Sequence, residues 1–286
     1  KGVKIIGDLP IYVASNSADT WQHPKLFYFD KHLRIKAVAG CPPDYFSKKG
    51  QLWGNVLYDW EAMKKENYSW WEQRIKHSFL LYDVLRLDHF RGFASYWAIR
   101  YGEKTAINGR WKIGPRIQFF RDLEKKVKNI DIIAEDLGTL TADVFKLLRQ
   151  TNYPNMKVLQ FGLTEWDNMY NPKNYTENSV AYTGTHDNDT LVGWFQKAKE
   201  EDREFARNYL NSRADEEIHW DAIRGAWSSV ANMAIAPIQD FLGLGSEARI
   251  NTPGLASGNW QWRLKDGVLT DELAERIAKL TKVYSR

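Results

Sequence analysis

Six short apolar runs alternate along the chain with longer amphipathic segments, and this alternation constrains the fold more than any other feature. Short apolar runs bounded by turn residues are typical of buried strands, whereas apolar side chains three and four residues apart are typical of helices. Strands that alternate with helices predict a parallel sheet covered by helices, the α/β class. The six runs are VKIIGDLP (3–10), DVLRLDHF (83–90), IDIIAEDLG (130–138), MKVLQFGL (156–163), SVAYTGTHD (179–187) and MAIAPIQD (233–240).

Four segments have the pattern of amphipathic helices. Ser69 and Glu72 form a capping-box signature, which predicts Ser69 as the N-cap of the first, and Thr270 is the expected N-cap of the last. Residues 11–60 are interrupted by Gly and Pro and are expected to be mostly an ordered loop with short elements. The helices are expected at 69–82, with Trp71, Ile75, Phe79 and Tyr82 on one stripe, at 116–130, at 141–150 and around Leu273, Ile277 and Leu280.

Composition excludes several classes of protein. The 286 residues include 40 basic and 36 acidic side chains, well mixed, so no basic stripe points to nucleic acid. No apolar run approaches the 18 or so residues that suggest a transmembrane helix, so no membrane partner is expected. Cys41 is the only cysteine, which rules out an intrachain disulfide and agrees with a reducing cytoplasm, the expected location. The chain lacks an initiator Met and opens on a strand-like run, so we expect a fragment.

Aromatic side chains are unusually numerous. The chain has 13 Trp, 14 Tyr and 13 Phe, more Trp than a core of this size is expected to need. Flat aromatic faces at a wet surface suit the rings of sugars or bases.

Acidic residues collect at the carboxyl ends of the apolar runs. In barrels and open sheets of the α/β class, this edge is where active sites form. The residues are Asp8, Asp88, Glu135, Asp187 and, less regularly, Glu165.

Two of these acids have contrasting surroundings. Arg86 lies two residues before Asp88 on the same face of its strand, and a nearby guanidinium favours the ionised carboxylate, as a nucleophile or charge stabiliser requires. Glu135 follows an apolar run, so partial desolvation is expected to raise its pKa, as a general acid requires. A strand-end Asp can also be just the N-cap of the next helix, and that alternative stays open for each acid alone.

The order Asp, Glu, His-Asp on successive strands favours chemistry over capping. Three acids without a Cys/His cluster point away from a metal site, and the absence of nucleotide-binding glycine motifs agrees with no cofactor. A pair of carboxylates fits glycoside chemistry, in which one attacks the sugar carbon and the other protonates the leaving oxygen.

Several stretches resemble the amylomaltases, or disproportionating enzymes, which are 4-α-glucanotransferases of the α-amylase clan. The combination of RLDHFRGF, IIAEDLG and GTHDND in this order is highly specific, and QLWGN and RINTPG distinguish the family from ordinary α-amylases. Val56 and Cys41 depart from the Pro and Val usual in the family. The matching stretches are GDLPIYVA (7–14), SADTW (17–21), VAGCPPDYFSKKGQLWGNVLYDW (38–60), RLDHFRGF (86–93), IIAEDLG (132–138), YTGTHDNDT (182–190), RINTPG (249–254) and GNWQWR (258–263).

The resemblance implies a (β/α)8 TIM-barrel fold, here incomplete. Family members carry about two hundred further residues ahead of GDLP, so residues 1–286 are expected to form one truncated catalytic barrel domain with strands three to eight and loop or helical insertions. The first and last strands, at 3–9 and 233–240, are then expected to lack a partner on one side, a known hazard for a sheet.

The resemblance also implies residue roles. Asp88 is expected to be the nucleophile, Glu135 the acid/base, and Asp187 the carboxylate that holds the sugar hydroxyls. The carboxyls of Asp88 and Glu135 are expected about 5–5.5 Å apart, as retention of configuration requires, with Asp187 converging on them. Further substrate contacts are expected from Arg86, His186, Asp8, Trp53 and Asn251, although Trp53 could be core and Asn251 a turn residue.

The implied substrates are α-1,4-glucans such as maltooligosaccharides, starch or glycogen, with no metal and no cofactor. Transfer exceeds hydrolysis when an acceptor hydroxyl is held in place and water is kept out, a task for the aromatic loops 42–58 and 245–260. The alternatives are a retaining α-glucan hydrolase, an inactive fragment or module that only binds glucan, and, less favoured, a nucleic-acid binder.

Overall fold

The computed structural model describes residues 1–43, 47–255 and 257–286, and the chain divides into two compact units, Lys1–Asn155 and Met156–Arg286. Within the loops expected to control transfer, residues 44–46 and 256 lie outside the described residues. The expectation of one barrel domain over the whole chain stays a prediction.

The first unit contains the parallel strands β1 (Ile6–Leu9), β4 (Val84–Leu87) and β7 (Ile132–Ala134), and Ala134 pairs with Asn155, the first residue of β8 (Asn155–Val158). β1 pairs with β4 and β4 with β7, all in parallel. Every residue of β4 and β7 is buried, because parallel strands are covered on both faces. The register aligns Asp8 with Arg86, which brings the two side chains to the same face.

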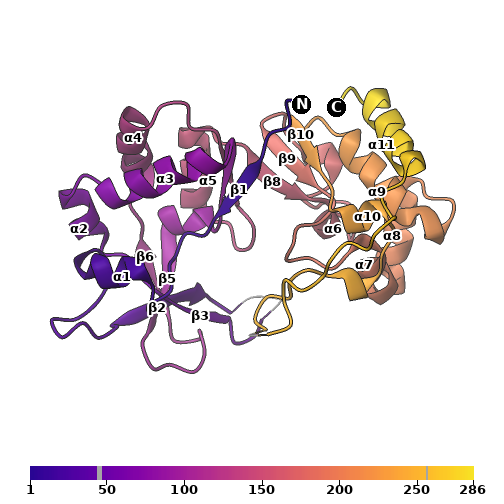
Figure 1. Ribbon diagram of the computed structural model, residues 1–286. Helices are drawn as coiled ribbons and strands as arrows, with labels where there is room; N and C mark the ends of the chain where they lie inside the picture. The colour runs from indigo at the N-terminus through magenta and orange to yellow at the C-terminus, as the bar shows by residue number, and fades with distance from the viewer. Residues whose placement is uncertain (44–46, 256) are drawn as a thin grey trace. The chain divides into compact units, whose positions relative to one another are not determined.

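Helices cover these strands in the first unit (Figure 1). They are α3 (Ser69–Leu81), α4 (Arg116–Lys126) and α5 (Ala142–Thr151). The expected stripe is confirmed, since Trp71 and Ile75 are buried and Phe79 and Tyr82 pack against the same core. The predicted capping box is wrong: α3 starts at Ser69 itself, after Tyr68 in the left-handed conformation (φ 55°). Glu72 instead binds Lys76, one turn along the helix, because a lysine four residues on lies within reach.

A second, antiparallel sheet of the first unit was not predicted. Its order is β3 (Gln51–Val56), β2 (Ala37–Cys41), β5 (Ser95–Arg100) and β6 (Arg110–Ile113), and its central pairing, β2 with β5, joins segments far apart in sequence. Consecutive residues of β3 are exposed, which removes the alternation that identifies a strand. The short helices α1 (Ala18–Gln22) and α2 (Trp60–Lys65), with a 3-10 turn at Pro24–Leu26, complete this region.

Much of the aromatic excess forms the core of the first unit. Phe93 stacks on Phe119 with ring centroids 5.2 Å apart, and Trp71 meets both rings edge-on. All three side chains are essentially inaccessible to solvent. Other tryptophans remain at the surface, with exposed fractions of 84% for Trp21, 61% for Trp166 and 56% for Trp260. The aromatic composition therefore serves both the core and the surface.

The second unit contains the strands β8, β9 (Ser179–Tyr182) and β10 (Met233–Ile235), hydrogen-bonded in this order, with β9 and β10 parallel. Strand β8 ends at Val158, earlier than expected, because Leu159–Gly162 form the helical turn α6. In their own units, β1 pairs with β4 alone and β10 with β9 alone among the described residues, as expected for these two strands.

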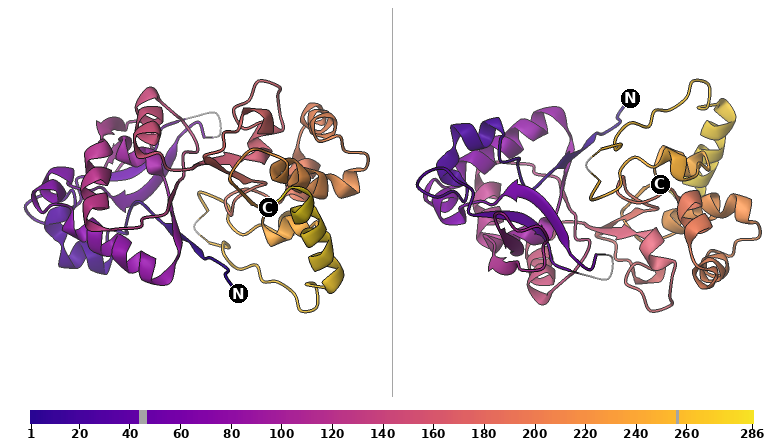
Figure 2. Two further views of the ribbon diagram at one scale, coloured as in Figure 1. Left: turned by 90° about the horizontal axis from the view of Figure 1, so that it is seen from above. Right: turned by 90° about the horizontal axis from the view of Figure 1, so that it is seen from below.

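The second unit also contains further helices besides α6 (Figure 2). α9 (Ile218–Trp227) is buried along most of its length and packs against α7 (Leu191–Lys197), α8 (Glu200–Leu210), α10 (Ile238–Phe241) and α11 (Asp271–Val283). The predicted cap of α11 is confirmed, because the Thr270 hydroxyl accepts a hydrogen bond from Leu273 N at 3.2 Å. Leu273, Ile277 and Leu280 pack against the core of this unit.

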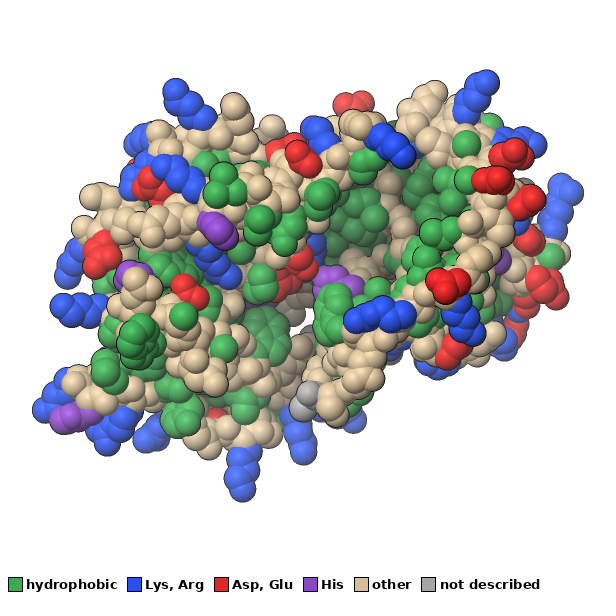
Figure 3. Space-filling model, viewed as in Figure 1, with side chains coloured by type: hydrophobic (Ala, Val, Ile, Leu, Met, Phe, Trp, Pro, Cys, Tyr) green, Lys and Arg blue, Asp and Glu red, His purple; other side chains and the backbone are tan. Residues whose placement is uncertain are grey.

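The surface in Figure 3 carries interspersed basic and acidic side chains, in agreement with the mixed charge of the sequence. Among the helices of the described residues, none combines the length and apolar character that a membrane span requires.

We predict that Phe119→Ala destabilises the first unit by about 3–5 kcal/mol, because it removes a ring from the centre of a packed aromatic cluster. Urea denaturation followed by tryptophan fluorescence measures the change. Trp21→Ala is the matched control at an exposed aromatic position and is expected to change the free energy of unfolding by no more than about 0.5 kcal/mol. A loss below about 1 kcal/mol for Phe119→Ala would show that this cluster does not hold the unit together.

Candidate active site

Strand β4 delivers Asp88 to the carboxyl end of the sheet in the first unit. The backbone N–H of Asp88 donates to the Leu9 carbonyl at 3.1 Å, so β1 fixes the residue where β4 ends. Two positions earlier, the guanidinium of Arg86 is buried and donates from Nη1 to Asp8 Oδ1 at 2.6 Å and to Asp88 Oδ1 at 3.2 Å. Arg86 therefore joins Asp88, its expected neighbour, to Asp8, whose contact with Arg86 was not predicted.

The charge of Arg86 is stabilised in place. Burial lowers the pKa of its guanidinium, but the negative charges of Glu135, Asp8 and Asp88 outweigh that effect and the pKa is raised overall. The Asp8 and Asp88 side chains keep about two fifths of their surface exposed, 42% and 39%. The buried cation therefore holds Oδ1 of both carboxylates while part of each side chain stays accessible to solvent.

Glu135 follows β7 and is buried. Its backbone N–H donates to the Leu87 carbonyl at 3.0 Å, which fixes it beside the end of β4. Oε2 of its carboxyl accepts the backbone N–H of His89 at 2.6 Å, and Oε1 accepts that of Leu137 at 2.7 Å.

Burial raises the pKa of Glu135 to about 8. The positive charge of Arg86 opposes this rise, the negative charge of Asp88 adds to it, and the two backbone N–H donors oppose it. The predicted desolvation of Glu135 is thus confirmed. One carboxyl holds a proton near neutral pH while the other sits against a guanidinium, the contrast that separates acid from nucleophile. Their expected separation of about 5–5.5 Å stays a prediction.

Trp53 lies on β3 with 36% of its surface exposed, so it is not an ordinary core residue. Its ring meets the imidazole of His89 edge-on, with centroids 4.7 Å apart. The indole N–H donates to the Gln51 side chain at 3.0 Å. Trp53 thus adjoins the residue that binds Glu135.

Asp187 lies in the second unit, in the segment that follows β9. Its Oδ1 accepts the side-chain amide of Asn251 at 2.5 Å, and its backbone carbonyl accepts Nη2 of Arg249 at 2.7 Å. His186 Nε2 lies 3.4 Å from Asp187 Oδ2, and the His186 ring packs against Trp260 at 5.1 Å. Asn251 is therefore more than a turn residue. The convergence of Asp187 with Asp88 and Glu135 stays a prediction.

The segment that carries His186 and Asp187 is anchored at both ends by Asp240. This buried carboxylate accepts the Thr183 hydroxyl at 2.6 Å and the backbone N–H of Leu191 at 2.8 Å. Burial raises the pKa of Asp240 to about 6, against the effect of these two donors. The other acid considered at a strand end, Glu165, is exposed.

Three residues beside the expected set were missed. His89 acts through its backbone N–H, which donates to the Glu135 carboxyl, and Arg249 acts through its guanidinium, which donates to the Asp187 backbone carbonyl. Residue type alone does not reveal either contact. Trp260 lies within GNWQWR, a matched stretch, so its aromatic character was the available signal.

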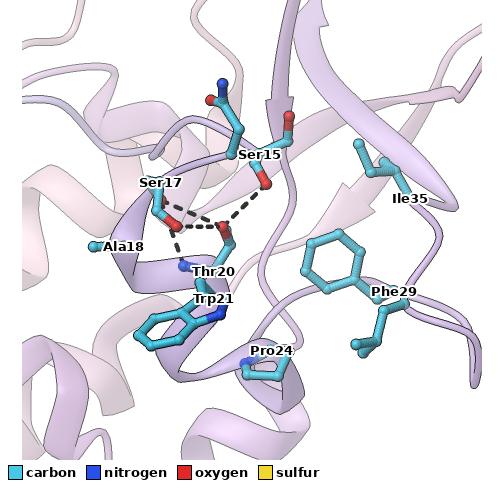
Figure 4. Close-up of a pocket in the computed structure, with 10 residues that line it drawn as sticks. Ser15, Ser17, Ala18, Thr20, Trp21, Pro24, Phe29 and Ile35 are labelled. Atoms are coloured by element: carbon cyan, nitrogen blue, oxygen red, sulfur yellow. Dashed lines mark hydrogen bonds between the residues drawn. The ribbon is translucent and has the colours of Figure 1, made fainter.

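A hollow of about 610 Å³ in the first unit does not include the carboxylates. It lies around α1 and is lined by side chains that include Ser15, Ser17, Thr20 and Phe29. Figure 4 shows that the Thr20 hydroxyl is engaged with neighbouring atoms: Oγ1 lies 3.0 Å from the Ser15 carbonyl and 2.9 Å from that of Ser17. Among the described residues, no group of three or more His, Cys, Asp or Glu side chains could hold a metal ion.

Parallel strands, covering helices and acids after the strand ends define an α/β fold of the (β/α)-barrel type, with six barrel strands among the residues that the structure describes. The chain belongs to the 4-alpha-glucanotransferase family, whose model matches residues 1–270.

Known proteins similar to this chain carry the same description. The 4-alpha-glucanotransferase of Clostridium butyricum is 51% identical over 289 residues, which cover 100% of this chain and 59% of that protein. A chloroplastic/amyloplastic 4-alpha-glucanotransferase of Arabidopsis thaliana is 47% identical, covering 100% and 50%. The structure of the amylomaltase from Streptococcus agalactiae in complex with acarbose matches with a TM-score of 0.96 at 39% identity, covering 100% of this chain and 58% of that one. The chain thus spans little more than half the length of these relatives.

We predict that Glu135→Gln stabilises the protein progressively more as the pH rises. The folded state holds the Glu135 proton up to about pH 8, whereas a glutamate carboxyl with its ordinary pKa of 4.5 releases the proton near pH 4.5 in the unfolded chain. Stability from this group is therefore fully present below pH 4.5 and is lost as the pH rises towards 8. Glutamine does not titrate, so its advantage should grow between pH 4.5 and 9, on the order of a few kcal/mol.

Urea titrations of both proteins at several pH values measure this change. Asp240→Asn is the control, because its advantage should be complete near pH 6, the approximate pKa of Asp240. A difference between the Gln variant and the unchanged protein that stays constant from pH 4.5 to 9 would contradict the raised pKa of Glu135.

Proposed function

We propose that this chain carries the catalytic residues of a 4-α-glucanotransferase, which transfers an α-1,4-glucan segment to another glucan or to glucose with retention of configuration. The observation that carries the proposal is the contrast between Glu135, buried with a pKa near 8, and Asp88, in contact with the Arg86 guanidinium.

In the first step, a carboxylate oxygen of Asp88 attacks the anomeric carbon of the donor glucan. The glycosidic bond breaks, its electron pair goes to the departing oxygen, and the proton of Glu135 is transferred to that oxygen. The products are a glucan with a free hydroxyl and a glycosyl ester on Asp88. Arg86 favours the ionised form of Asp88 that this attack needs.

In the second step, the roles of Glu135 reverse. Because esterified Asp88 carries no negative charge, the contribution of Asp88 to the raised pKa of Glu135 disappears, which favours the carboxylate. Ionised Glu135 then takes the proton of the acceptor hydroxyl, and the acceptor oxygen attacks the anomeric carbon. The ester bond breaks and Asp88 is restored as a carboxylate.

Asp187 is proposed to hold sugar hydroxyls and to favour the distorted ring of the transition state. Asn251 donates a hydrogen bond to Asp187, and His186 lies next to Asp187. Both residues are therefore suited to contact the same sugar. In the first unit, Asp8 and Trp53 are proposed as further contacts, and Arg86 is proposed to touch the sugar as well as Asp88. The partly exposed ring of Trp53 can stack on a sugar face.

The proposed substrates are α-1,4-glucans, and no cofactor is proposed. The proposed location is the cytoplasm, whereas the plant relatives are described as chloroplastic/amyloplastic. A retaining α-glucan hydrolase is the second candidate, because it uses the same ester intermediate. The absence of a basic stripe in the sequence disfavours nucleic acid.

We predict that Asp88→Asn lowers both transfer and hydrolysis by several orders of magnitude, because no glycosyl ester forms. Glu135→Gln should be equally slow on glucans but should still react with a glycosyl fluoride, whose leaving group needs little protonation. The ester should then accumulate, because the base of the second step is missing, and mass spectrometry should detect a glycosyl group on Asp88. Undiminished activity of Glu135→Gln on glucans would remove Glu135 from the mechanism.

We predict that the enzyme fed maltotriose releases glucose and makes chains longer than maltotriose. Chromatography of the products distinguishes the two candidates. Maltose and glucose without longer chains would identify a hydrolase, and unchanged maltotriose with measurable binding would identify a glucan-binding module.

A further inference from the structure

His89 adopts a backbone conformation that few side chains tolerate. Its φ of 50° and ψ of 47° lie in the left-handed region, directly after Asp88 and before the 3-10 turn Phe90–Phe93. Histidine, asparagine and aspartate enter this region more readily than other residues with a side chain, whereas β-branched residues are strongly disfavoured. The chain therefore turns sharply between Asp88 and Phe90.

This turn clamps Glu135 from one side. Leu87 accepts the Glu135 backbone N–H at 3.0 Å, and Phe90 donates its own N–H to the Glu135 carbonyl at 3.0 Å. Between these two bonds, His89 donates its N–H to Glu135 Oε2 at 2.6 Å. The other donor to the carboxyl, Leu137, belongs to the segment of Glu135 itself. Through its backbone N–H, His89 therefore links the Glu135 carboxyl to the end of the strand that precedes Asp88.

The imidazole of His89 is packed rather than charged. Burial, with a smaller effect of Arg91, lowers its pKa to about 3, so the ring is neutral at physiological pH. It contacts Trp53 edge-on at 4.7 Å and lies 6.4 Å from the ring of Tyr12. A Cβ placed at Gly92 would come within 3.2 Å of His89 Cδ2, so glycine at position 92 leaves the space that the ring borders.

We propose that His89 is a positioning residue for the acid/base step, and that it acts through its left-handed backbone, whose N–H fixes the Glu135 carboxyl relative to Asp88. The imidazole packs against Trp53 and is not itself required for this hydrogen bond. The inference rests on the proposed function for its kinetic part only, because the hydrogen bond itself can be measured without substrate.

His89→Gly and His89→Val separate the backbone from the ring. Both variants lack the imidazole, but glycine adopts the left-handed conformation freely and valine does not. In the glycine variant the N–H should still reach Glu135. In the valine variant the bond should be lost, and the pKa of Glu135 should rise further, because this donor favours the carboxylate. Arg86 and Asp88, the charged groups that also act on Glu135, are the same in both variants.

The first measurement is the NMR titration of the 13C-labelled Glu135 carboxyl in the complete protein. The expected result is a pKa near that of the unchanged protein for His89→Gly and a higher one for His89→Val. Equal titration in the two variants would overturn the proposal. His89→Ala, whose cost in the left-handed region is smaller than that of valine, gives the same comparison if the valine variant does not fold.

The second measurement is the pH profile of glucan transfer. His89→Val should lower kcat about 10- to 100-fold relative to His89→Gly, the effect of losing a hydrogen bond to a charged group, with KM changed much less. Its basic limb should move to higher pH. Equal losses of kcat in both variants, with unmoved limbs, would mean that the ring and not the backbone matters. If the two variants titrate differently but the unchanged protein transfers no glucan, the proposed function is rejected, whereas the positioning of Glu135 by His89 stands.

Discussion

The buried guanidinium of Arg86 is the interaction on which the candidate site of the first unit depends. A cation inside a sheet is costly unless it is paired, and Arg86 is paired with Asp8 from β1 and Asp88 at the end of its own strand. The same charge lies close enough to Glu135 to moderate its pKa. Three carboxylates from three neighbouring strands therefore share one cation, and each feels a different balance of burial and charge.

This arrangement explains how two similar groups can do different chemistry. Asp88 keeps about two fifths of its side chain exposed and touches the guanidinium, whereas Glu135 is enclosed and is bound by two backbone N–H groups. The enclosure favours the proton and the donors favour the carboxylate, so the pKa of Glu135 lies near neutrality instead of at either extreme. A group that is proposed to give a proton in one step and take one in the next needs such a balance.

In the second unit, hydrogen bonds orient the loop that carries His186 and Asp187. Asp187 is held by Asn251 through its side chain and by Arg249 through its backbone, both from a segment some sixty residues further along the chain. Asp240 ties the two ends of the same loop to the core, at Thr183 and Leu191. These hydrogen bonds hold the polar loop in one conformation, so that Asp187 has a fixed orientation.

The sequence by itself determined the parallel strands, the helices α3, α4, α5 and α11, and the acids at the strand ends, because apolar periodicity and strand-end position are local properties. It also indicated the burial of Glu135, since three apolar residues precede that carboxyl. The antiparallel sheet, the true start of α3 and the left-handed turn at His89 were decided by tertiary structure alone. Pairing between β2 and β5 joins residues about sixty positions apart, and the N–H of His89 reaches Glu135 only because β4 and β7 are neighbours. Local pattern identifies the residues that can carry chemistry. The donors that affect the pKa of Glu135, however, are backbone N–H groups, which nearly every residue has, so only the fold determines which of them reach the carboxyl.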